Sequence, residues 1–149
     1  MERISYQDIP KGMFENLRTI EDYITHSKID YQLLELIKLR LSQINKCAYC
    51  VDMHYKELKH TGETELRLSS LCVWKETPFF SERERVVLQF VEELSNLSTK
   101  ELSEATYESL LLYFNKAEIS YLTLAIGQIN TWNTLMKVFR FEPGHYQVK

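Results

Sequence analysis

The sequence predicts an all-α fold of about seven helices, in one domain spanning residues 1–149. The chain has 149 residues, of which 44% are hydrophobic, enough apolar material for one core. It contains only 4 Gly and 3 Pro, too few for the many tight turns of an all-β fold. Apolar residues recur at helical spacing along the chain, and no pair of segments carries a hairpin signal. These observations together favour a helical bundle.

Apolar spacing, capping residues and helix breakers place the boundaries of the predicted helices. Asn45 can cap the third helix, and Gly62 is a good stop for it. Ser81 with Glu84 forms a capping box that begins the fifth helix. The expected helices cover residues 11–27, 31–44, 46–61, 63–74, 81–94, 103–114 and 115–139.

Charge and hydropathy exclude several classes of partner. Eighteen Lys and Arg against 21 Asp and Glu give a net charge of -3, without the basic footprint of a nucleic-acid-binding protein. Residues 1–14 carry charges and a proline where a secretory signal needs an apolar run. The longest apolar stretch, residues 121–126, is far below the roughly 20 residues needed to cross a bilayer. We therefore expect a cytoplasmic protein with neither a nucleic acid nor a membrane as partner.

The main chemical signal is the pair Cys47-x-x-Cys50 followed by His54. At about 100° per residue, the three side chains fall within an arc of roughly 60° on one helix face and can share a pocket. Cys50 and His54 are four residues apart and can touch, whereas Cys47 and His54 lie about 10 Å apart along the helix axis. His54 is therefore expected to serve Cys50 more directly.

This spacing favours thiol redox chemistry. A helix N-terminus lowers the pKa of a nearby thiol from about 8.5, and this effect is largest at Cys47. A second thiol three residues away can resolve a sulfenic acid or a mixed disulfide formed on the first. Three cysteines are an odd number, which disfavours a framework of structural disulfides. Cys72 lies in the apolar run 68–74 and is expected to be a buried core residue.

Two other interpretations of the cysteine pair stay open. A Cys-x-x-Cys pair with a nearby His is also a zinc pattern, but a structural zinc site usually takes a second ligand pair. The remaining candidates His26, His60, His145 and Cys72 are isolated in the sequence. Inert packing of the two cysteines is the other alternative.

The spacing of these residues resembles the alkylhydroperoxidase D-like branch of the carboxymuconolactone decarboxylase superfamily. Glu35, followed twelve residues later by Cys47 and Cys50 and then by His54, is similar to the Glu, Cys-x-x-Cys, His arrangement of that branch. The segments 129–133 and 141–144 resemble its last helix and tail. The decarboxylase branch lacks the cysteine pair, so the resemblance argues against lactone decarboxylation.

The resemblance implies an alkylhydroperoxidase D-like helical fold, assembly into trimers or hexamers, and thiol-dependent peroxide reduction. Glu35 would then hold His54, which helps to activate Cys50 and Cys47. The helical spacing alone does not predict this role, because Glu35 shares one side of its helix with Lys38 and Ser42, as on an ordinary solvated face.

One position departs from the branch. Well-studied peroxidases of this branch have a His immediately before the second cysteine, where this chain has Tyr49. A phenol with a pKa of about 10 is a poor proton relay at neutral pH, although it can donate a hydrogen bond. Tyr49 is therefore a possible auxiliary residue.

The sequence thus predicts a thiol-dependent peroxide or disulfide reductase of the antioxidant type, with Glu35, Cys47, Cys50 and His54 as catalytic residues and no cofactor or metal. A dihydrolipoyl or thioredoxin-like partner is the expected reductant. The alternatives are a non-catalytic redox sensor or interaction module and a zinc-binding scaffold. A homo-oligomer is also expected because the apolar residues of segment 33–41 cover more of their helix than one amphipathic stripe requires.

Overall fold

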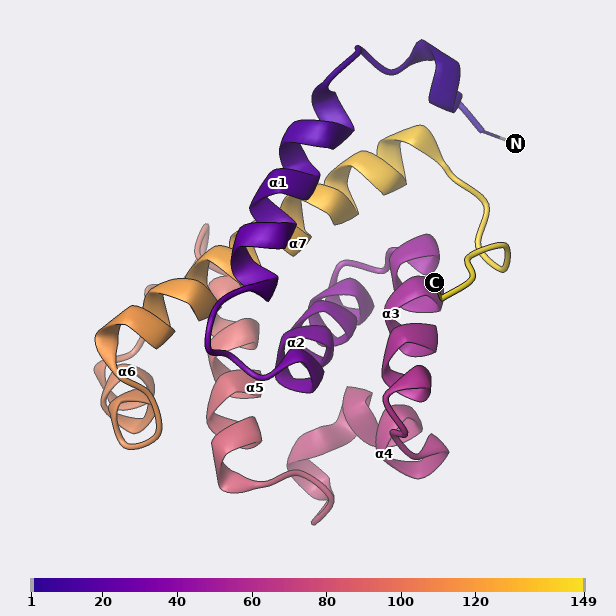
Figure 1. The fold of residues 1–149 in the computed structure, drawn as a ribbon. Helices are drawn as coiled ribbons and strands as arrows, with labels where there is room; N and C mark the ends of the chain where they lie inside the picture. The colour runs from indigo at the N-terminus through magenta and orange to yellow at the C-terminus, as the bar shows by residue number, and fades with distance from the viewer. Residues whose placement is uncertain (1, 149) are drawn as a thin grey trace.

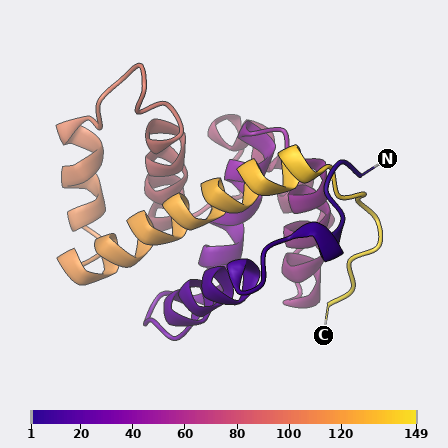
Figure 2. The ribbon, with the colours of Figure 1, turned by 90° about the horizontal axis from the view of Figure 1, so that it is seen from above.

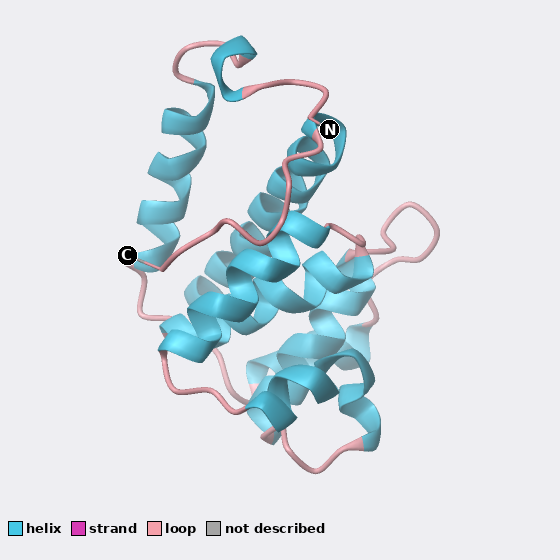
Figure 3. Cartoon of the chain, turned by 90° about the vertical axis from the view of Figure 1, so that its right-hand side faces the viewer, coloured by secondary structure: helices cyan, strands magenta, loops and turns pink. Residues whose placement is uncertain are grey.

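The computed structural model describes residues 2–148, which form seven α-helices and two short 3-10 helices without any strand (Figure 3). The all-α prediction is therefore confirmed. None of the helices in this part of the chain combines the length and apolar character needed to span a bilayer. In chain order the elements are η1 (Tyr6–Asp8), α1 (Met13–Thr25), α2 (Tyr31–Ile44), α3 (Ala48–His60), α4 (Glu65–Ser70), η2 (Leu71–Glu76), α5 (Glu82–Leu94), α6 (Glu104–Leu111) and α7 (Lys116–Phe139).

Helix α2 lies at the centre of the molecule, with α3 and α5 on either side of it (Figure 1). The 24-residue helix α7 runs across the bundle and packs against both α2 and α1 (Figure 2). Helix α6 packs against α5. This arrangement surrounds α2 on several sides, which explains why its apolar residues cover more than one stripe of the helix.

The apolar residues of α2 are covered by the chain itself. The structure corrects the reasoning that a partner copy must shield them, because helices α3, α5 and α7 already do so. A central helix is apolar on most of its surface, and the sequence cannot distinguish this case from an oligomer interface. The buried apolar residues of segment 33–41 are Leu33, Leu34, Leu36, Ile37, Leu39 and Leu41.

The polar side of α2 is also buried, so the expectation of a solvated face is wrong. Glu35 has only 2% of its surface exposed, and Lys38 and Ser42 are likewise buried. Ser42 accepts a hydrogen bond from the Asn133 amide at 3.0 Å. The helical spacing correctly groups the polar residues on one side, but their partners lie on other helices.

The turn between α2 and α3 differs from the prediction. Cys47 is the N-cap of α3, whereas Asn45 is the C-cap of α2. Lys46 between them has a φ of 55°, a left-handed conformation that reverses the chain within a very short connection. The Asn45 side chain binds the Asn130 and Asn133 amide oxygens of α7 at 3.0 Å. This turn places Cys47 and Cys50 in the first turn of α3.

The predicted helix 63–74 is interrupted. It consists of α4 and the 3-10 helix η2, and Val73 in η2 has non-helical backbone angles. Leu68, Leu71 and Trp74 are buried at three-residue intervals, which matches the 3-10 period. Cys72 lies between these positions and is exposed, so its prediction as a core residue is wrong.

Several predicted helix ends are confirmed. Capping boxes are present at Ser81 with Glu84 and at Asn115 with Glu118. At the end of α3, Gly62 has a φ of 93°, and its N–H donates to the Lys59 carbonyl at 3.0 Å. The next N–H, of Glu63, donates to the Leu58 carbonyl at 3.1 Å, which completes a Schellman motif.

Two glycine substitutions should change stability in opposite directions. Gly62→Ala should lower the free energy of unfolding by about 1 kcal/mol, because alanine rarely adopts a positive φ. Gly127→Ala, within α7 and with no atom near its added Cβ, should raise it by about 0.5 to 1 kcal/mol through helix propensity. Urea unfolding of both variants measures this difference, and shifts of the same sign would contradict the assigned helix ends.

Candidate functional site

The predicted site residues come from α2 and from the start of α3. The structure pairs the sulfur atoms of Cys47 and Cys50 as a disulfide, with Cα atoms 5.4 Å apart. Both cysteines are buried in a small apolar cluster with Phe14, Met136 and Phe139. The cysteine pair therefore lies where α3 meets α1 and the end of α7.

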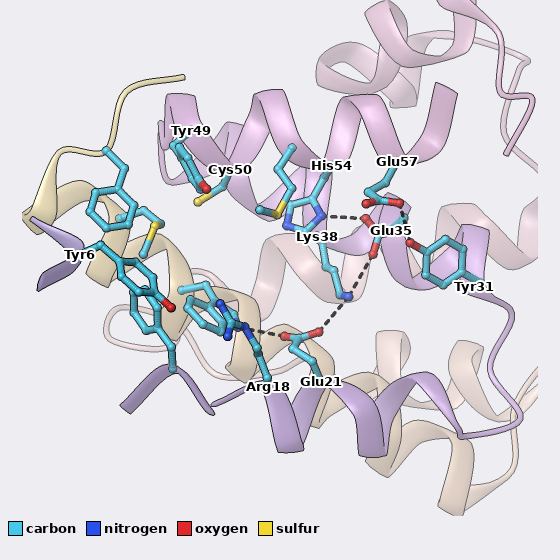
Figure 4. Close-up of a pocket in the computed structure, with 15 residues that line it drawn as sticks. Tyr6, Arg18, Glu21, Tyr31, Glu35, Lys38, Tyr49, Cys50, His54 and Glu57 are labelled. Carbon is cyan, nitrogen blue, oxygen red and sulfur yellow. Dashed lines mark hydrogen bonds and ion pairs between the residues drawn. The ribbon is translucent and has the colours of Figure 1, made fainter. Parts of the chain in front are cut away.

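Glu35 and His54 form a direct contact between α2 and α3. His54 Nδ1 lies 2.7 Å from Glu35 Oε2, and both side chains are buried (Figure 4). A carboxylate can only accept a hydrogen bond, so Nδ1 carries the proton in this pair. In neutral His54 the other ring nitrogen, Nε2, is then an unprotonated acceptor. The structure thus brings Glu35 and His54 together as the family resemblance implied.

A chain of ion pairs continues from the buried Glu35 to the half-buried Glu21. Lys38 Nζ lies 3.0 Å from Glu35 Oε1 and 2.9 Å from Glu21 Oε2 of α1. The indole N–H of Trp132 in α7 donates to Glu21 Oε1 at 3.1 Å. Figure 4 shows this chain running from α3 through α2 to α1. The charge of Glu35 is therefore balanced by neighbouring side chains.

These contacts determine the ionisation of the buried pair. Burial alone would raise the pKa of Glu35, but hydrogen bonds and charge interactions with His54 and Lys38 lower this pKa to about 2. Burial would likewise lower the pKa of Lys38, but the carboxylates of Glu35 and Glu21 outweigh it and raise this pKa. Glu35 is therefore a carboxylate at neutral pH and can orient His54 permanently.

A first cavity of about 320 Å³ opens beside Cys50 and His54. Its volume is at the lower end for small-molecule sites. The charged groups that line it are Arg18, Glu21, Glu35, Lys38 and Glu57. Its apolar lining comes from Tyr6, Phe14, Met53, Trp132, Met136 and Phe141, which belong to the N-terminal segment, α1, α3, α7 and the C-terminal tail.

Cys47 does not line this cavity. It faces a second, more open cavity of about 510 Å³, so the expectation that both cysteines and His54 share one pocket is wrong. Cys47 is the N-cap of α3, one residue before its first helical residue, and its sulfur is bonded to that of Cys50. Tyr49, Met136 and Phe141 line both cavities and separate them.

Tyr49, the possible auxiliary residue, is half-buried between the two cavities. Its ring packs edge-on against Phe141, with ring centroids 5.8 Å apart. Burial and the negative charge of Asp52 raise the pKa of Tyr49, although the positive charge of Arg18 opposes this. The phenol therefore keeps its proton at neutral pH and can act only as a hydrogen-bond donor or acceptor.

The C-terminal tail crosses α3 beside the site (Figure 1). The Gly144 N–H donates to Asp52 at 3.0 Å, and Lys56 donates to the carbonyls of Gly144 and Tyr146. The Tyr146 hydroxyl donates to Glu57, which also accepts from a second tyrosine of α2. On the other side, the Arg3 N–H donates to the last carbonyl of α7 at 2.8 Å.

Sequence reasoning did not identify the roles of Glu21, Lys38 and Trp132. Glu35 and Lys38 are three residues apart on α2, which is a recognisable ion-pair spacing. Glu21 and Trp132 lie on other helices, and no spacing in the sequence connects them to Glu35. Within residues 2–148, no three His, Cys, Asp or Glu side chains are grouped so as to hold a metal ion.

Comparison with known proteins identifies the family. A family model described as carboxymuconolactone decarboxylase matches residues 11–93, which include Glu35, Cys47, Cys50 and His54. The chain belongs to the carboxymuconolactone decarboxylase family. Its relative YdfG of Bacillus subtilis, an uncharacterised protein, is 36% identical over 90% of this chain and 91% of YdfG. Another uncharacterised protein, YnjA of Escherichia coli, is 29% identical over 70% of this chain and 57% of YnjA.

Solved structures place the chain in the alkylhydroperoxidase D-like branch of this family. A protein of unknown function from Agrobacterium tumefaciens, for which a role as the antioxidant defence protein AhpD has been suggested, superposes with a TM-score of 0.92. It is 36% identical, and the match covers 98% of this chain and all of that one. A peroxidase-related protein from Silicibacter shares the fold with a TM-score of 0.79 at 23% identity, over 88% of this chain and 70% of that one. The debrominase Bmp8 shares it with a TM-score of 0.77 at 17% identity, with the same coverage.

Glu35→Gln should make the stability of this family member less dependent on pH in acid. The folded pKa of Glu35, about 2, lies below its ordinary value of 4.5. Its contribution is therefore complete above about pH 4.5 and is lost as the pH falls toward 2. The wild type should lose about 3 kcal/mol more than Glu35→Gln over this interval.

Urea unfolding between pH 2 and 7 measures this difference. Glu108→Gln removes an exposed carboxylate of α6 and serves as the control, which should follow the wild type. At pH 7, Glu35→Gln should be less stable than the wild type by about 3 kcal/mol, because it leaves His54 and Lys38 without their shared partner. Parallel pH profiles for the wild type and Glu35→Gln would contradict the chain of ion pairs at Glu35.

Proposed function

We propose that this protein is a thiol-dependent peroxide or disulfide reductase that cycles between the Cys47/Cys50 dithiol and its disulfide. The observation that carries this proposal is the contact of Glu35 with His54 Nδ1, one helical turn from Cys50. It leaves Nε2 as the acceptor in neutral His54, and both His54 and Cys50 line the first cavity. A general base beside a thiol is the arrangement that activates a cysteine nucleophile.

In the first step, His54 accepts the Cys50 proton, and the thiolate attacks one oxygen of the peroxide. The O–O bond breaks, Cys50 becomes a sulfenic acid, and the other oxygen leaves as an alcohol or water after it receives a proton. The Cys47 thiol then attacks the Cys50 sulfur, which forms the disulfide and releases water. A dithiol reductant finally returns two electrons and regenerates both thiols.

The contacts around Glu35 and His54 support the roles proposed for these two residues. Glu35 holds one tautomer of His54, and Lys38 with Glu21 keeps Glu35 charged. The apolar lining of the first cavity suits an organic peroxide. The relative from Agrobacterium tumefaciens, with its suggested antioxidant role, supports the same class of reaction. A dihydrolipoyl or thioredoxin-like reductant, a trimeric or hexameric assembly and a cytoplasmic location remain predictions.

A non-catalytic redox sensor is the second candidate. The nearly complete burial of Cys47 and Cys50, with 2% and 3% of their surfaces exposed, favours a disulfide that changes packing rather than one that turns over. The two candidates differ in steady-state kinetics. An enzyme consumes many equivalents of peroxide when a dithiol is supplied, whereas a sensor consumes one.

Substitution of the cysteines tests the dithiol cycle. Cys47→Ser and Cys50→Ser should each abolish dithiol-dependent consumption of cumene hydroperoxide, because neither variant can form the disulfide. Cys72→Ser should retain nearly full activity, since Cys72 is exposed on η2 and lines neither cavity. Peroxide consumption is the measurement. If it falls equally in all three variants, the assignment of Cys47 and Cys50 as the reactive pair is wrong.

Substitution of His54 tests the general base. His54→Gln should lower the peroxide-dependent rate of disulfide formation by about 10²-fold near pH 7, the lower range for general-base assistance. Activity should partly recover above roughly pH 9, where the thiol ionises without help. His60→Gln, at the exposed end of the same helix, is the control and should not change the profile. The rates are measured by stopped flow. If those of His54→Gln and the wild type agree at every pH, His54 is not a general base and serves only in packing.

A further inference from the structure

Cys47 belongs to two helix ends at once. As the N-cap of α3, its carbonyl accepts the Val51 N–H at 2.9 Å. Its own N–H donates to the Ser42 carbonyl at 3.0 Å, and the Lys46 N–H donates to the Gln43 carbonyl at 3.1 Å. These two bonds form the Schellman motif that ends α2. The position of Cys47 therefore depends on how α2 ends as well as on how α3 begins.

The turn between these helices contains a strained residue. Lys46, with its φ of 55°, occupies the position of the Schellman motif at which glycine is usual. A left-handed conformation is unfavourable for a residue that has a Cβ atom. Such a residue persists where the surrounding structure over-determines its conformation, and such positions cluster at functional sites. The turn is therefore expected to be held by contacts from another part of the chain.

Helix α7 supplies these contacts through Asn45, the residue before Lys46. The Asn45 side-chain amide donates to the side-chain oxygens of Asn130 and Asn133, each at 3.0 Å. The Asn45 carbonyl accepts from Lys137 Nζ at 2.7 Å. Asn130, Asn133 and Lys137 are three and then four residues apart, so they lie on one face of α7. That face holds both the side chain and the backbone of Asn45.

Asn133 is the buried centre of these contacts. It has only 1% of its surface exposed, and its amide N–H donates to Ser42 Oγ at 3.0 Å. Ser42 is also the residue whose carbonyl accepts the Cys47 N–H. Asn133 thus contacts Asn45 through its oxygen and Ser42 through its nitrogen. One buried amide of α7 therefore holds the end of α2 on both sides of the turn that leads to Cys47.

The reduced protein depends on these contacts more than the oxidised protein does. In the oxidised protein the S–S bond ties Cys47 to Cys50 in the first turn of α3. In the reduced protein this tie is absent, and Cys47 lies at a helix end, where helices fray. A turn that stays ordered without the S–S bond keeps the two thiols close, so less conformational entropy is lost when the disulfide forms. A looser turn should therefore favour the dithiol over the disulfide.

Building on the proposed dithiol cycle, we propose that Asn45 and Asn133 are positioning residues that hold Cys47 beside Cys50 in the reduced protein and so stabilise the disulfide relative to the dithiol. Neither asparagine lines the first or the second cavity. Their effect therefore passes through the turn and the backbone of Cys47, and not through contact with a substrate. Helix α7 in this way adjusts the redox equilibrium of a cysteine pair that lies on α3.

Equilibration with glutathione tests this role in the absence of peroxide. Two glutathione molecules are oxidised to one glutathione disulfide for each protein disulfide that is reduced to two thiols. Acid quenching, alkylation of free thiols and mass spectrometry then give the ratio of dithiol to disulfide. Asn45→Ala and Asn133→Ala should each shift this equilibrium about five- to tenfold toward the dithiol, the effect of one or two lost hydrogen bonds. Asn45 is only half-buried, so Asn45→Ala decides alone if Asn133→Ala does not fold.

Gln128→Ala is the matched control for a general loss of stability. Gln128 is another buried amide of α7, but it donates to the Leu17 carbonyl of α1 at 2.9 Å and not to the turn. This variant should unfold at a lower urea concentration than the wild type, yet keep the wild-type ratio of dithiol to disulfide. An equal shift in Gln128→Ala, or no shift in Asn45→Ala, would overturn the proposal.

A second substitution in the turn should rescue the disulfide. Lys46→Gly and Lys46→Ala remove the same charge, but only glycine favours a positive φ. In the Asn45→Ala background, Lys46→Gly should return most of the lost disulfide stability and Lys46→Ala should not. Equal effects of the two substitutions would show that the order of the turn does not set the equilibrium, which would overturn the proposal.

The outcomes separate this role from the proposed peroxidase activity. If the shifts and the rescue are found but the wild type does not consume peroxide, the positioning role stands and the peroxidase proposal fails. If the wild type consumes peroxide but both asparagine variants keep its glutathione equilibrium, the positioning role alone fails.

Discussion

The site depends on keeping the Glu35 carboxylate charged inside the bundle. An isolated buried carboxylate would take up a proton, because transfer of a charge away from water is costly. Here Glu35 has His54 on one side and Lys38 on the other, and Lys38 is paired in turn with Glu21. These ionic contacts join α1, α2 and α3. The position of His54, one helical turn from Cys50, and the packing of three helices therefore rest on the same contacts.

This dependence explains why α2 occupies the centre of the fold. A helix that supplies a buried carboxylate must be covered on its polar side as well as on its apolar side. Helices α3, α5 and α7 cover the apolar residues of α2, and α1 brings Glu21 to Lys38. The hydrogen bond from Trp132 to Glu21 adds α7 to the polar side. Residues of α1, α2, α3 and α7 thus contribute to holding one imidazole in place.

Much of this could be predicted from the sequence, because helix formation depends largely on local patterns. The span of α2 and the capping boxes of α5 and α7 follow from spacing and side-chain chemistry, as does the stop at Gly62. The turn before α3 could not be predicted in detail, because nothing in the sequence indicates that Lys46 adopts a left-handed conformation. The burial of Glu35 could not be predicted from spacing either, since its partners lie on separate helices. The resemblance to a family identified Glu35 where the helical pattern could not.

The first cavity is closed partly by the two ends of the described chain. Tyr6 and Phe141 line it and both pack against the ring of Phe14, while the backbone of their segments is held by contacts such as those of the tail with Asp52 and Lys56. Terminal segments with few buried contacts detach at a lower free energy than the core unfolds. Widening of the first cavity beside Cys50 is then a local opening equilibrium of these two segments, and it leaves the seven helices folded.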